Sequence, residues 1–275
     1  MKKILKTLLL GAVFIAGIFS IMACFDGVRS DPPSPRPSSL VPSIDALGNV
    51  GMNTSIAIGT DGFPVVSYRQ GQDNSLGDFG LRVAHCGNAA CSAGITRSTL
   101  DNALNPFSTS IAIGTDGFPV ISHDDGNVLK VAHCGNADCS AGNATAIVDE
   151  GDASGASIAI GTDGFPVVSY GRYSLGDFGL RVAHCGNADC SAGNTISPLD
   201  VSGSVFYTSI AIGTDGLPVV SYYDTSDGDL KVAHCANVDC SRNIIATVDG
   251  SGRVGGRTSI TIGRDGFPVV SYYDR

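Results

Sequence analysis

The stretch S-I-A-I-G-T-D-G-F-P-V-V-S-Y, at residues 55–68, decides the fold of this chain because it recurs along most of its 275 residues. Close copies begin at Ser110, Ser157, Ser209 and Ser259. The D-G glycines of the five copies, at positions 62, 117, 164, 216 and 266, are 55, 47, 52 and 50 residues apart. A second segment, L-(R/K)-V-A-H-C-x4-C, begins at Leu81, Leu129, Leu180 and Leu230. Self-similarity at this period indicates a repeat architecture.

Each unit is predicted to form four short antiparallel strands. Ser-Ile-Ala-Ile suits a pleated strand, and the D-G pair forms the turn after it because glycine supplies positive φ. Pro64 then stands where the first residue of a strand tolerates proline. Val-Val-Ser-Tyr is the second strand, L-K-V-A-H-C the third, and a run such as 244–249 the fourth. An aspartate ends the run before each copy, at Asp45, Asp101, Asp149, Asp200 and Asp249.

Four antiparallel strands in about 50 residues is the period of a propeller blade. The sequence therefore predicts an all-β fold, a β-propeller of about five four-stranded repeats whose last unit is incomplete. Helical repeats are excluded by the frequency of Gly and Pro, and a parallel β-helix usually has a shorter coil. Either an N-terminal strand near Ser43 helps to close a five-bladed ring, or the chain is a fragment of a longer repeat array.

The repeat elements D-G-x-P-V-V-S-Y-Y-D and L-K-V-x-H-C-G-N-x-x-C resemble those of uncharacterised bacterial exported propeller proteins, over residues 44–275. This resemblance implies the propeller fold and carries no assigned activity. The units are also loosely similar to the Asp-box repeats of sialidase-like propellers. The tryptophan that is usual in that box is absent, because this chain contains no tryptophan.

The N-terminus reads as an export signal. Lys2, Lys3 and Lys6 precede an almost uninterrupted apolar run at 8–21, so residues 1–23 are predicted to be a signal peptide. The tetrapeptide I-M-A-C resembles a bacterial lipobox, which makes Cys24 the candidate lipidated residue. Ordinary cleavage and an uncleaved anchor are the alternatives, and the run is short against the roughly 20 apolar residues of a membrane-spanning helix.

Residues 24–43 are rich in Pro and Ser and are predicted to be a tether between this cysteine and the propeller domain at 44–275. We expect an exported protein that is lipid-anchored to the bacterial cell envelope, or alternatively secreted. Contact with the membrane is expected only through the lipid or the N-terminal anchor. The formal charge of −9 makes nucleic acid a poor partner, because an acidic surface repels phosphate.

Eight of the nine cysteines fall into pairs that are predicted to be disulfides, since even numbers of cysteine at fixed spacing are typical of exported proteins. The pairs are Cys86 with Cys91, Cys134 with Cys139, Cys185 with Cys190, and Cys235 with Cys240. A histidine precedes each pair, at His85, His133, His184 and His234, so zinc is the alternative. Adjacent His and Cys point to opposite faces of a strand, which favours the disulfides and a structural role for the histidines.

The repeated turn aspartates are interpreted as residues that bond their own backbone. They are Asp61, Asp116, Asp163, Asp215 and Asp265. A calcium site needs several oxygen ligands close together. Asp224, Asp227 and Asp229 form the best local candidate for one, and they occur in one unit only.

The sequence gives little support for an enzyme. Glycoside hydrolysis usually needs two placed carboxylates, and the chain has a single glutamate, Glu150. His123 replaces the tyrosine of the other units and stands beside Asp124. For a sialidase-like hydrolase, His123, Asp124 and Glu150 would have to converge in one cleft. No G-x-S-x-G, H-E-x-x-H or phosphate-loop motif occurs, and no metal or other cofactor is expected.

The tyrosines that end the second strands offer contact area and a hydroxyl group. Tyr68, Tyr170, Tyr222 and Tyr223 are therefore the candidate binding residues, and packing between blades is the alternative role. The resulting hypothesis is an extracytoplasmic binding or scaffold module whose partner is an unknown protein or glycan. The alternatives are a sialidase-like glycoside hydrolase and a fragment of a longer array.

Overall fold

The computed structural model describes residues 43–46, 50–71, 80–102, 108–174 and 176–274. These residues form strands and turns, and no helix among them is long and apolar enough to cross a membrane. The predicted signal peptide, the candidate lipidation site Cys24 and nearly all of the tether lie outside the described residues.

Four sheets contain four antiparallel strands in sequence order, and a fifth contains two, as the repeat predicts. The first sheet is β1 (Val50–Ile58), β2 (Pro64–Gln70), β3 (Gly80–His85) and β4 (Thr96–Asp101). The second is β5 (Ser108–Ile113), β6 (Pro119–Asp124), β7 (Val128–His133) and β8 (Ala144–Glu150). The third is β9 (Ala153–Ile160), β10 (Pro166–Ser174), β11 (Asp177–His184) and β12 (Thr195–Asp200). The fourth is β13 (Val205–Ile212), β14 (Pro218–Asp224), β15 (Asp229–Cys235) and β16 (Asn243–Asp249), and the fifth is β17 (Val254–Ile262) with β18 (Pro268–Asp274).

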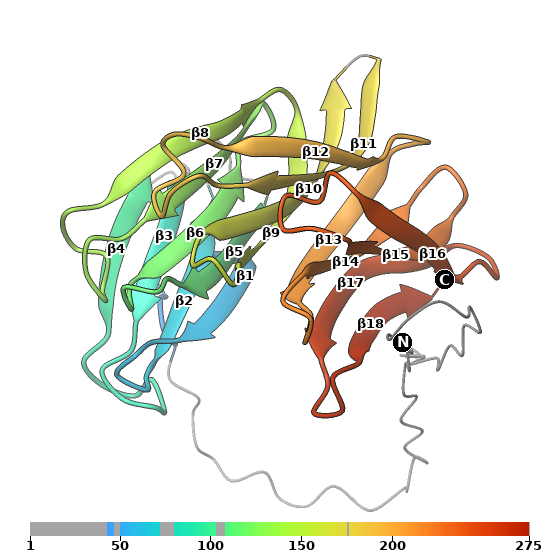
Figure 1. The fold of residues 1–275 in the computed structure, drawn as a ribbon. Helices are drawn as coiled ribbons and strands as arrows, with labels where there is room; N and C mark the ends of the chain where they lie inside the picture. Colours follow the sequence, from blue (N-terminus) through green and yellow to red (C-terminus); the bar gives the residue numbers. More distant parts are fainter. Residues whose placement is uncertain (1–42, 47–49, 72–79, 103–107, 175, 275) are drawn as a thin grey trace, which may run out of the picture.

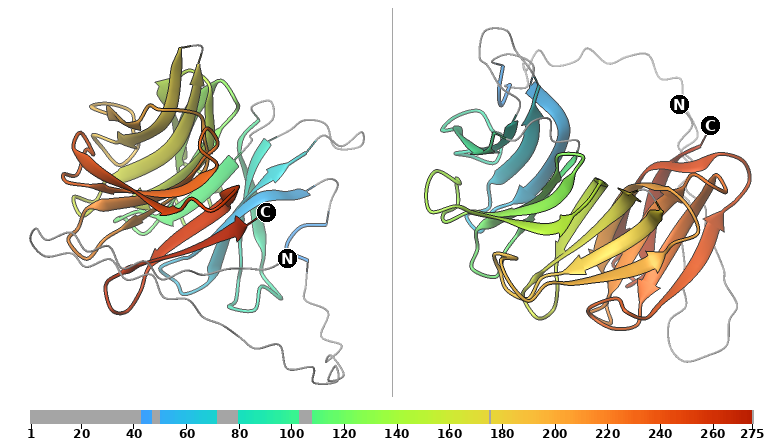
Figure 2. Two further views of the ribbon diagram at one scale, coloured as in Figure 1. Left: turned by 90° about the vertical axis from the view of Figure 1, so that its right-hand side faces the viewer. Right: turned by 90° about the horizontal axis from the view of Figure 1, so that it is seen from above.

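The five sheets follow one another as blades along an arc (Figures 1 and 2). The first strands β1, β5, β9, β13 and β17 contact each other in succession, which places them nearest the axis. The first and fifth blades stand at the two ends of the arc, and no strand ladder joins them within the described ranges. The fifth blade has two strands here, and residues 43–46 lie against the first blade rather than extending the fifth.

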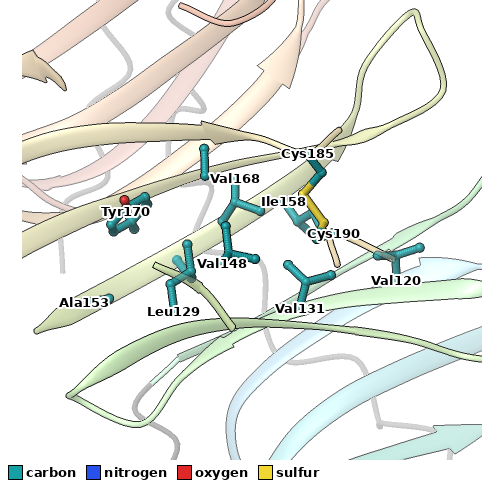
Figure 3. Packing of buried hydrophobic residues seen from close by; sticks show 12 residues of the cluster. Val120, Leu129, Val131, Val148, Ala153, Ile158, Val168, Tyr170, Cys185 and Cys190 are labelled. Carbon is teal, nitrogen blue, oxygen red and sulfur yellow. A yellow bond between two sulfur atoms is a disulfide. The ribbon is translucent and has the colours of Figure 1, made fainter. Parts of the chain in front are cut away.

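Apolar layers between neighbouring blades form the core. Figure 3 shows the layer between the second and third blades, where Val131 of β7 faces Ile158 of β9 and the Cys185–Cys190 pair. The first-strand isoleucine is 6–7% exposed in the four later blades. Its equivalent in β1, Ile56, is 63% exposed, and no blade precedes β1 within the described residues. Burial of each blade therefore depends on its neighbour, as in other repeat proteins.

Candidate functional site

The two ends of the propeller differ in how strictly they repeat. We call the end with the D-G turns and cysteine loops the disulfide end, and the end with the loops from second to third strand and from blade to blade the variable end. From the D-G glycine to the third-strand leucine the chain advances 19, 12, 16 and 14 residues (62 to 81, 117 to 129, 164 to 180, 216 to 230). From that leucine to the next unit's serine it advances 29, 28, 29 and 29 residues (81 to 110, 129 to 157, 180 to 209, 230 to 259). Variation in length is thus concentrated at the variable end.

The four predicted cysteine pairs are confirmed as disulfides at the disulfide end. Their Cα atoms are 4.8–4.9 Å apart, within the range of about 4.4–6.8 Å that disulfides require. Because the sulfur atoms are bonded to each other, the thiolates that the zinc alternative needs are not available.

The histidine before each pair lies within ion-pair distance of the turn aspartate of its own blade, which agrees with a structural role for both residue types. The Nε2 atoms of His85, His133, His184 and His234 lie 2.9, 2.9, 2.7 and 2.8 Å from the Oδ2 atoms of Asp61, Asp116, Asp163 and Asp215. The Oδ1 atom of each turn aspartate accepts the amide two residues later, as at Phe63. Each repeated pair therefore fastens a D-G turn to the third strand.

The candidate calcium cluster already holds a cation from the chain. The Lys231 ammonium group lies 2.5 Å from a carboxylate oxygen of Asp224 and 2.9 Å from one of Asp227. Burial alone would lower the pKa of Lys231, and the hydrogen bonds to these two carboxylates outweigh it, so that the pKa is raised and the lysine stays protonated. The cluster is a salt bridge within the fourth blade.

A second repeated pair links neighbouring blades at the variable end. The hydroxyl groups of Tyr68, Tyr170, Tyr222 and Tyr272 donate to carboxylates of Asp45, Asp149, Asp200 and Asp249 over 2.8, 2.6, 2.7 and 2.7 Å. Each aspartate lies at or one residue before the end of the fourth strand of the preceding blade, and Asp45 lies in the N-terminal segment. Burial, and next the hydrogen bond to aspartate, raise the pKa of all four tyrosines, so that they act as donors.

Three of the four candidate binding tyrosines are consequently buried in these links. Tyr68, Tyr170 and Tyr222 are 3%, 0% and 0% exposed, so their rings are not available to a ligand in solution. Tyr223 is half-buried and lines the cavity of about 800 Å³ described below, whereas Tyr68 borders a smaller cavity of about 200 Å³ beside Asp45. The sequence contained both halves of the link, since 21–23 residues separate the two partners in every unit, but the pairing between the two series was missed.

The His123, Asp124 and Glu150 constellation does not form a common centre. His123 is fully buried, and its Nε2 atom lies 3.0 Å from Oδ2 of Asp101, in the place of the tyrosine link. Asp124 is also fully buried and accepts a hydrogen bond from Ser108. Glu150 is exposed at the end of β8, two strands away from β6 in the same sheet.

A cavity of about 800 Å³ opens at the variable end, between the fourth and fifth blades. Its lining combines aromatic rings with arginines and comes from both blades. The lining residues are Phe206, Tyr207, Tyr223, Thr225, Arg253, Gly256, Arg257 and Tyr273. None of them is an aspartate or glutamate. Most of these residues lie outside the repeated segments, so the sequence singled out only Tyr223 and the equivalent Tyr273.

Two of the lining residues have a strained backbone. Tyr207 and Arg257 both have φ of 54°, at bulges two residues before the serine that opens each repeat segment. The same position is Gly155 in β9 and Asn53 in β1, which are residue types that tolerate positive φ. It is Ser108 in β5, where the ladder has no bulge. A bulky side chain in the left-handed region costs roughly 1–2 kcal/mol.

Comparison with solved structures identifies the architecture. A protein of unknown function from Dyadobacter fermentans matches with a TM-score of 0.62 and 10% identity, over 83% of this chain and 76% of that one. An α-L-arabinofuranosidase from Lactobacillus brevis matches with a TM-score of 0.50 and 12% identity, over 80% and 82% of the two chains. The chain is a β-propeller. No protein-family model and no curated protein matches it. At these identities the likeness shows the fold, which many unrelated functions share.

Proposed function

We propose that this propeller is an exported binding module that holds a saccharide in the cavity at the variable end. The observation that carries the proposal is the left-handed backbone of Tyr207 and Arg257 in the cavity lining. The repeat offers Gly and Asn for this position elsewhere, so the two bulky residues are retained against a conformational cost. Backbone strain of this kind is concentrated at ligand-binding and active sites.

The chemistry of the lining favours a saccharide. Tyr223, Tyr273 and Phe206 supply ring faces, and Arg253 and Arg257 supply hydrogen-bond donors. A sugar ring offers the complementary surfaces, with apolar C–H faces and hydroxyl groups around its edge. The volume of about 800 Å³ lies within the roughly 300–1,000 Å³ of small-molecule sites.

Binding is favoured over hydrolysis because no carboxylate stands among the lining residues that the structure describes. Glycosidases usually place two carboxylates on either side of the scissile bond, and Glu150 and Asp124 do not line this cavity. The similarity in fold to an arabinofuranosidase makes saccharides the first ligands to test. The aromatic and arginine residues of the lining are the argument for binding without cleavage.

Export is supported by four disulfides, which form and persist in oxidising compartments. We further propose that Cys24 carries the lipid that anchors the protein to the cell envelope. Cys24→Ala should move the protein from the membrane fraction to the soluble extracytoplasmic fraction. An unchanged membrane fraction for this variant would contradict lipidation at that residue.

The test of function is calorimetric titration of the folded protein with a panel of neutral and acidic oligosaccharides. Tyr223→Ala should weaken binding of the recognised saccharide by about tenfold or more, because truncating a ring in a binding site usually costs over 1 kcal/mol. Phe178→Ala is the matched control, since Phe178 is an exposed aromatic residue of β11 outside the cavity. Binding should release no reducing sugar. If no saccharide binds, or if both variants bind as the unchanged protein does, the proposal is wrong.

A further inference from the structure

The charge of the cavity narrows the class of saccharide, if the proposed binding function holds. The whole chain carries a formal charge of −9, yet among the described lining residues the ones that are charged at neutral pH are Arg253 and Arg257. Both arginines are exposed. The site is therefore locally positive on an acidic protein.

These two arginines are exceptions to the pairing found nearby. Arg172 bonds Asp149 and Asp177, Arg181 bonds Asp177, and Lys231 bonds Asp224 and Asp227. Neither Arg253 nor Arg257 forms an ion pair with any residue that the structure describes. Asp274 lies opposite Val254 in the β17–β18 register, and the Arg253 side chain packs against Gly228, which stands between Asp227 and Asp229 in the chain. Neither arginine forms an ion pair with any of these three aspartates.

One of the guanidinium groups is positioned by the strained bulges. The Arg257 carbon Cζ lies 6.0 Å from the centre of the Tyr207 ring, at the limit of a cation–π contact. Both residues of this contact are the left-handed ones. A guanidinium group carries its N–H donors in its own plane, where they can bind both oxygens of a carboxylate.

We propose that the cavity binds a saccharide that bears carboxylates, that is, a chain containing uronic acids. The carboxylates pair with Arg253 and Arg257, and the sugar rings contact Tyr223 and Tyr273. The overall negative charge does not prevent this, because exposed charges more than about 8–10 Å away are largely screened at physiological salt. Charge pairing at the site then decides the selectivity.

The test titrates several uronic-acid oligosaccharides, each beside its methyl ester, into the intact protein at 0.15 M salt, a concentration on the order of the physiological one. Esterification removes the charge and leaves the sugar rings. At least one acid should bind about ten- to a hundredfold more tightly than its ester, as a charge-assisted hydrogen bond predicts. Arg253→Gln and Arg257→Gln should lower the affinity for the acid towards that for the ester. Arg242→Gln, an exposed arginine in the last cysteine loop, is the matched control and should change neither.

The outcomes separate this inference from the function on which it rests. If acid and ester bind equally in every pair, and Tyr223→Ala abolishes both, the inference of an acidic ligand is wrong. The proposal of a saccharide-binding propeller then still stands. No binding of either form by a protein that unfolds cooperatively overturns both. Loss of acid binding in Arg242→Gln as well would show general charge attraction and would also overturn the assignment to the cavity.

Discussion

At the scale of single residues, Tyr207 and Arg257 break the local rule that the repeat follows elsewhere. Gly155 satisfies the same bulge without strain, because glycine has no Cβ atom to clash at positive φ. At these two positions the backbone conformation favours glycine, whereas the cavity lining contains a tyrosine and an arginine side chain. The effect can be measured, since replacing either residue by glycine should maintain or raise the stability of the fold and lower the affinity for the ligand.

Replacing Tyr207 by glycine is predicted to leave the protein at least as stable, while saccharide binding weakens. The substitution removes about 1–2 kcal/mol of left-handed strain, which stabilises the folded state. Glycine also raises the backbone entropy of the unfolded chain, which offsets part of this stabilisation. Chemical denaturation measures the first effect and calorimetry the second. Phe206→Gly is the control, because Phe206 is similarly exposed (37% against 44%) without positive φ, and it should be destabilised. A Tyr207→Gly protein that is clearly less stable would refute the strain argument.

Asp101 is predicted to make stability depend on acid pH. The hydrogen bond with His123 lowers the pKa of Asp101 most, burial opposes it, and Lys130 lowers the pKa further, so that it lies well below its usual value. A carboxylate with a depressed folded pKa contributes stability above its unfolded pKa of about 3.9, and that contribution is lost as the pH falls through the range below it.

Asp101→Asn should therefore reduce the free energy of unfolding at pH 7 by about 1–3 kcal/mol, the contribution of a hydrogen bond to a charged group. The variant should also lose less stability than the unchanged protein between pH 5 and roughly pH 3, the range that spans the unfolded pKa. Denaturation midpoints across this range provide the measurement. Asp152→Asn replaces an exposed aspartate and serves as control. Parallel pH curves for Asp101→Asn and the unchanged protein would count against this account.

The same residues show how far sequence reasoning reached. Cysteine spacing was sufficient to predict the disulfides, and the D-G turns bond their own backbone as predicted, because both depend on residues close in the chain. The Tyr–Asp links join different blades, and three candidate binding tyrosines are buried in them. The bulges at Tyr207 and Arg257 depend on strand register, which the local residue pattern does not determine.

At the scale of elements, the four disulfide loops have the same length but differ in how they pack against neighbouring blades. Each closes the same separation of five residues. Cys134 and Cys139 pack with Val65 and Leu81 of the preceding blade, whereas in the first blade Cys86 is buried and Cys91 is only half-buried, with no preceding blade among the described residues. Their contributions to stability should therefore differ through packing.

Replacing Cys134 and Cys139 together by alanine is predicted to cost more than replacing Cys86 and Cys91. Loop entropy contributes roughly 2 kcal/mol in either case. The buried pair should lose about a further 1–2 kcal/mol, because removing its sulfur atoms leaves space in the layer between two blades. Denaturant titration of the two double variants without reductant compares them. Equal losses would mean that the blades do not rely on this packing.

At the scale of the whole molecule, the prediction of an all-β propeller with four full units and one incomplete unit is confirmed. The described residues form an arc in which the fifth blade keeps two strands (Figure 2). Closure depends on contacts between the first and last units, and no local pattern specifies those. Asp45 nevertheless has the place of the aspartate that the preceding blade supplies elsewhere. Residues 43–46 do not form the strand expected near Ser43.

Hydrogen exchange is predicted to be fastest at the ends of the arc. The third blade has a neighbour on each side, whereas β18 has one strand partner and belongs to a terminal blade. In repeat proteins stability comes from each unit and its nearest neighbours, so terminal units open most easily. Exchange monitored by mass spectrometry should therefore show β10 and β11 protected longest and β18 least. Uniform protection would indicate a single cooperative unit.

The unequal spacing of the repeats has a consequence for the engineering of the chain. Within the chain, the loops between second and third strands differ in length from blade to blade, while the turns, histidines and disulfides at the opposite end recur in the four full blades. The loops between second and third strands can therefore differ while the turns and disulfides at the opposite end, and the Tyr–Asp links between blades, stay in place. The same division marks where foreign loops could be grafted.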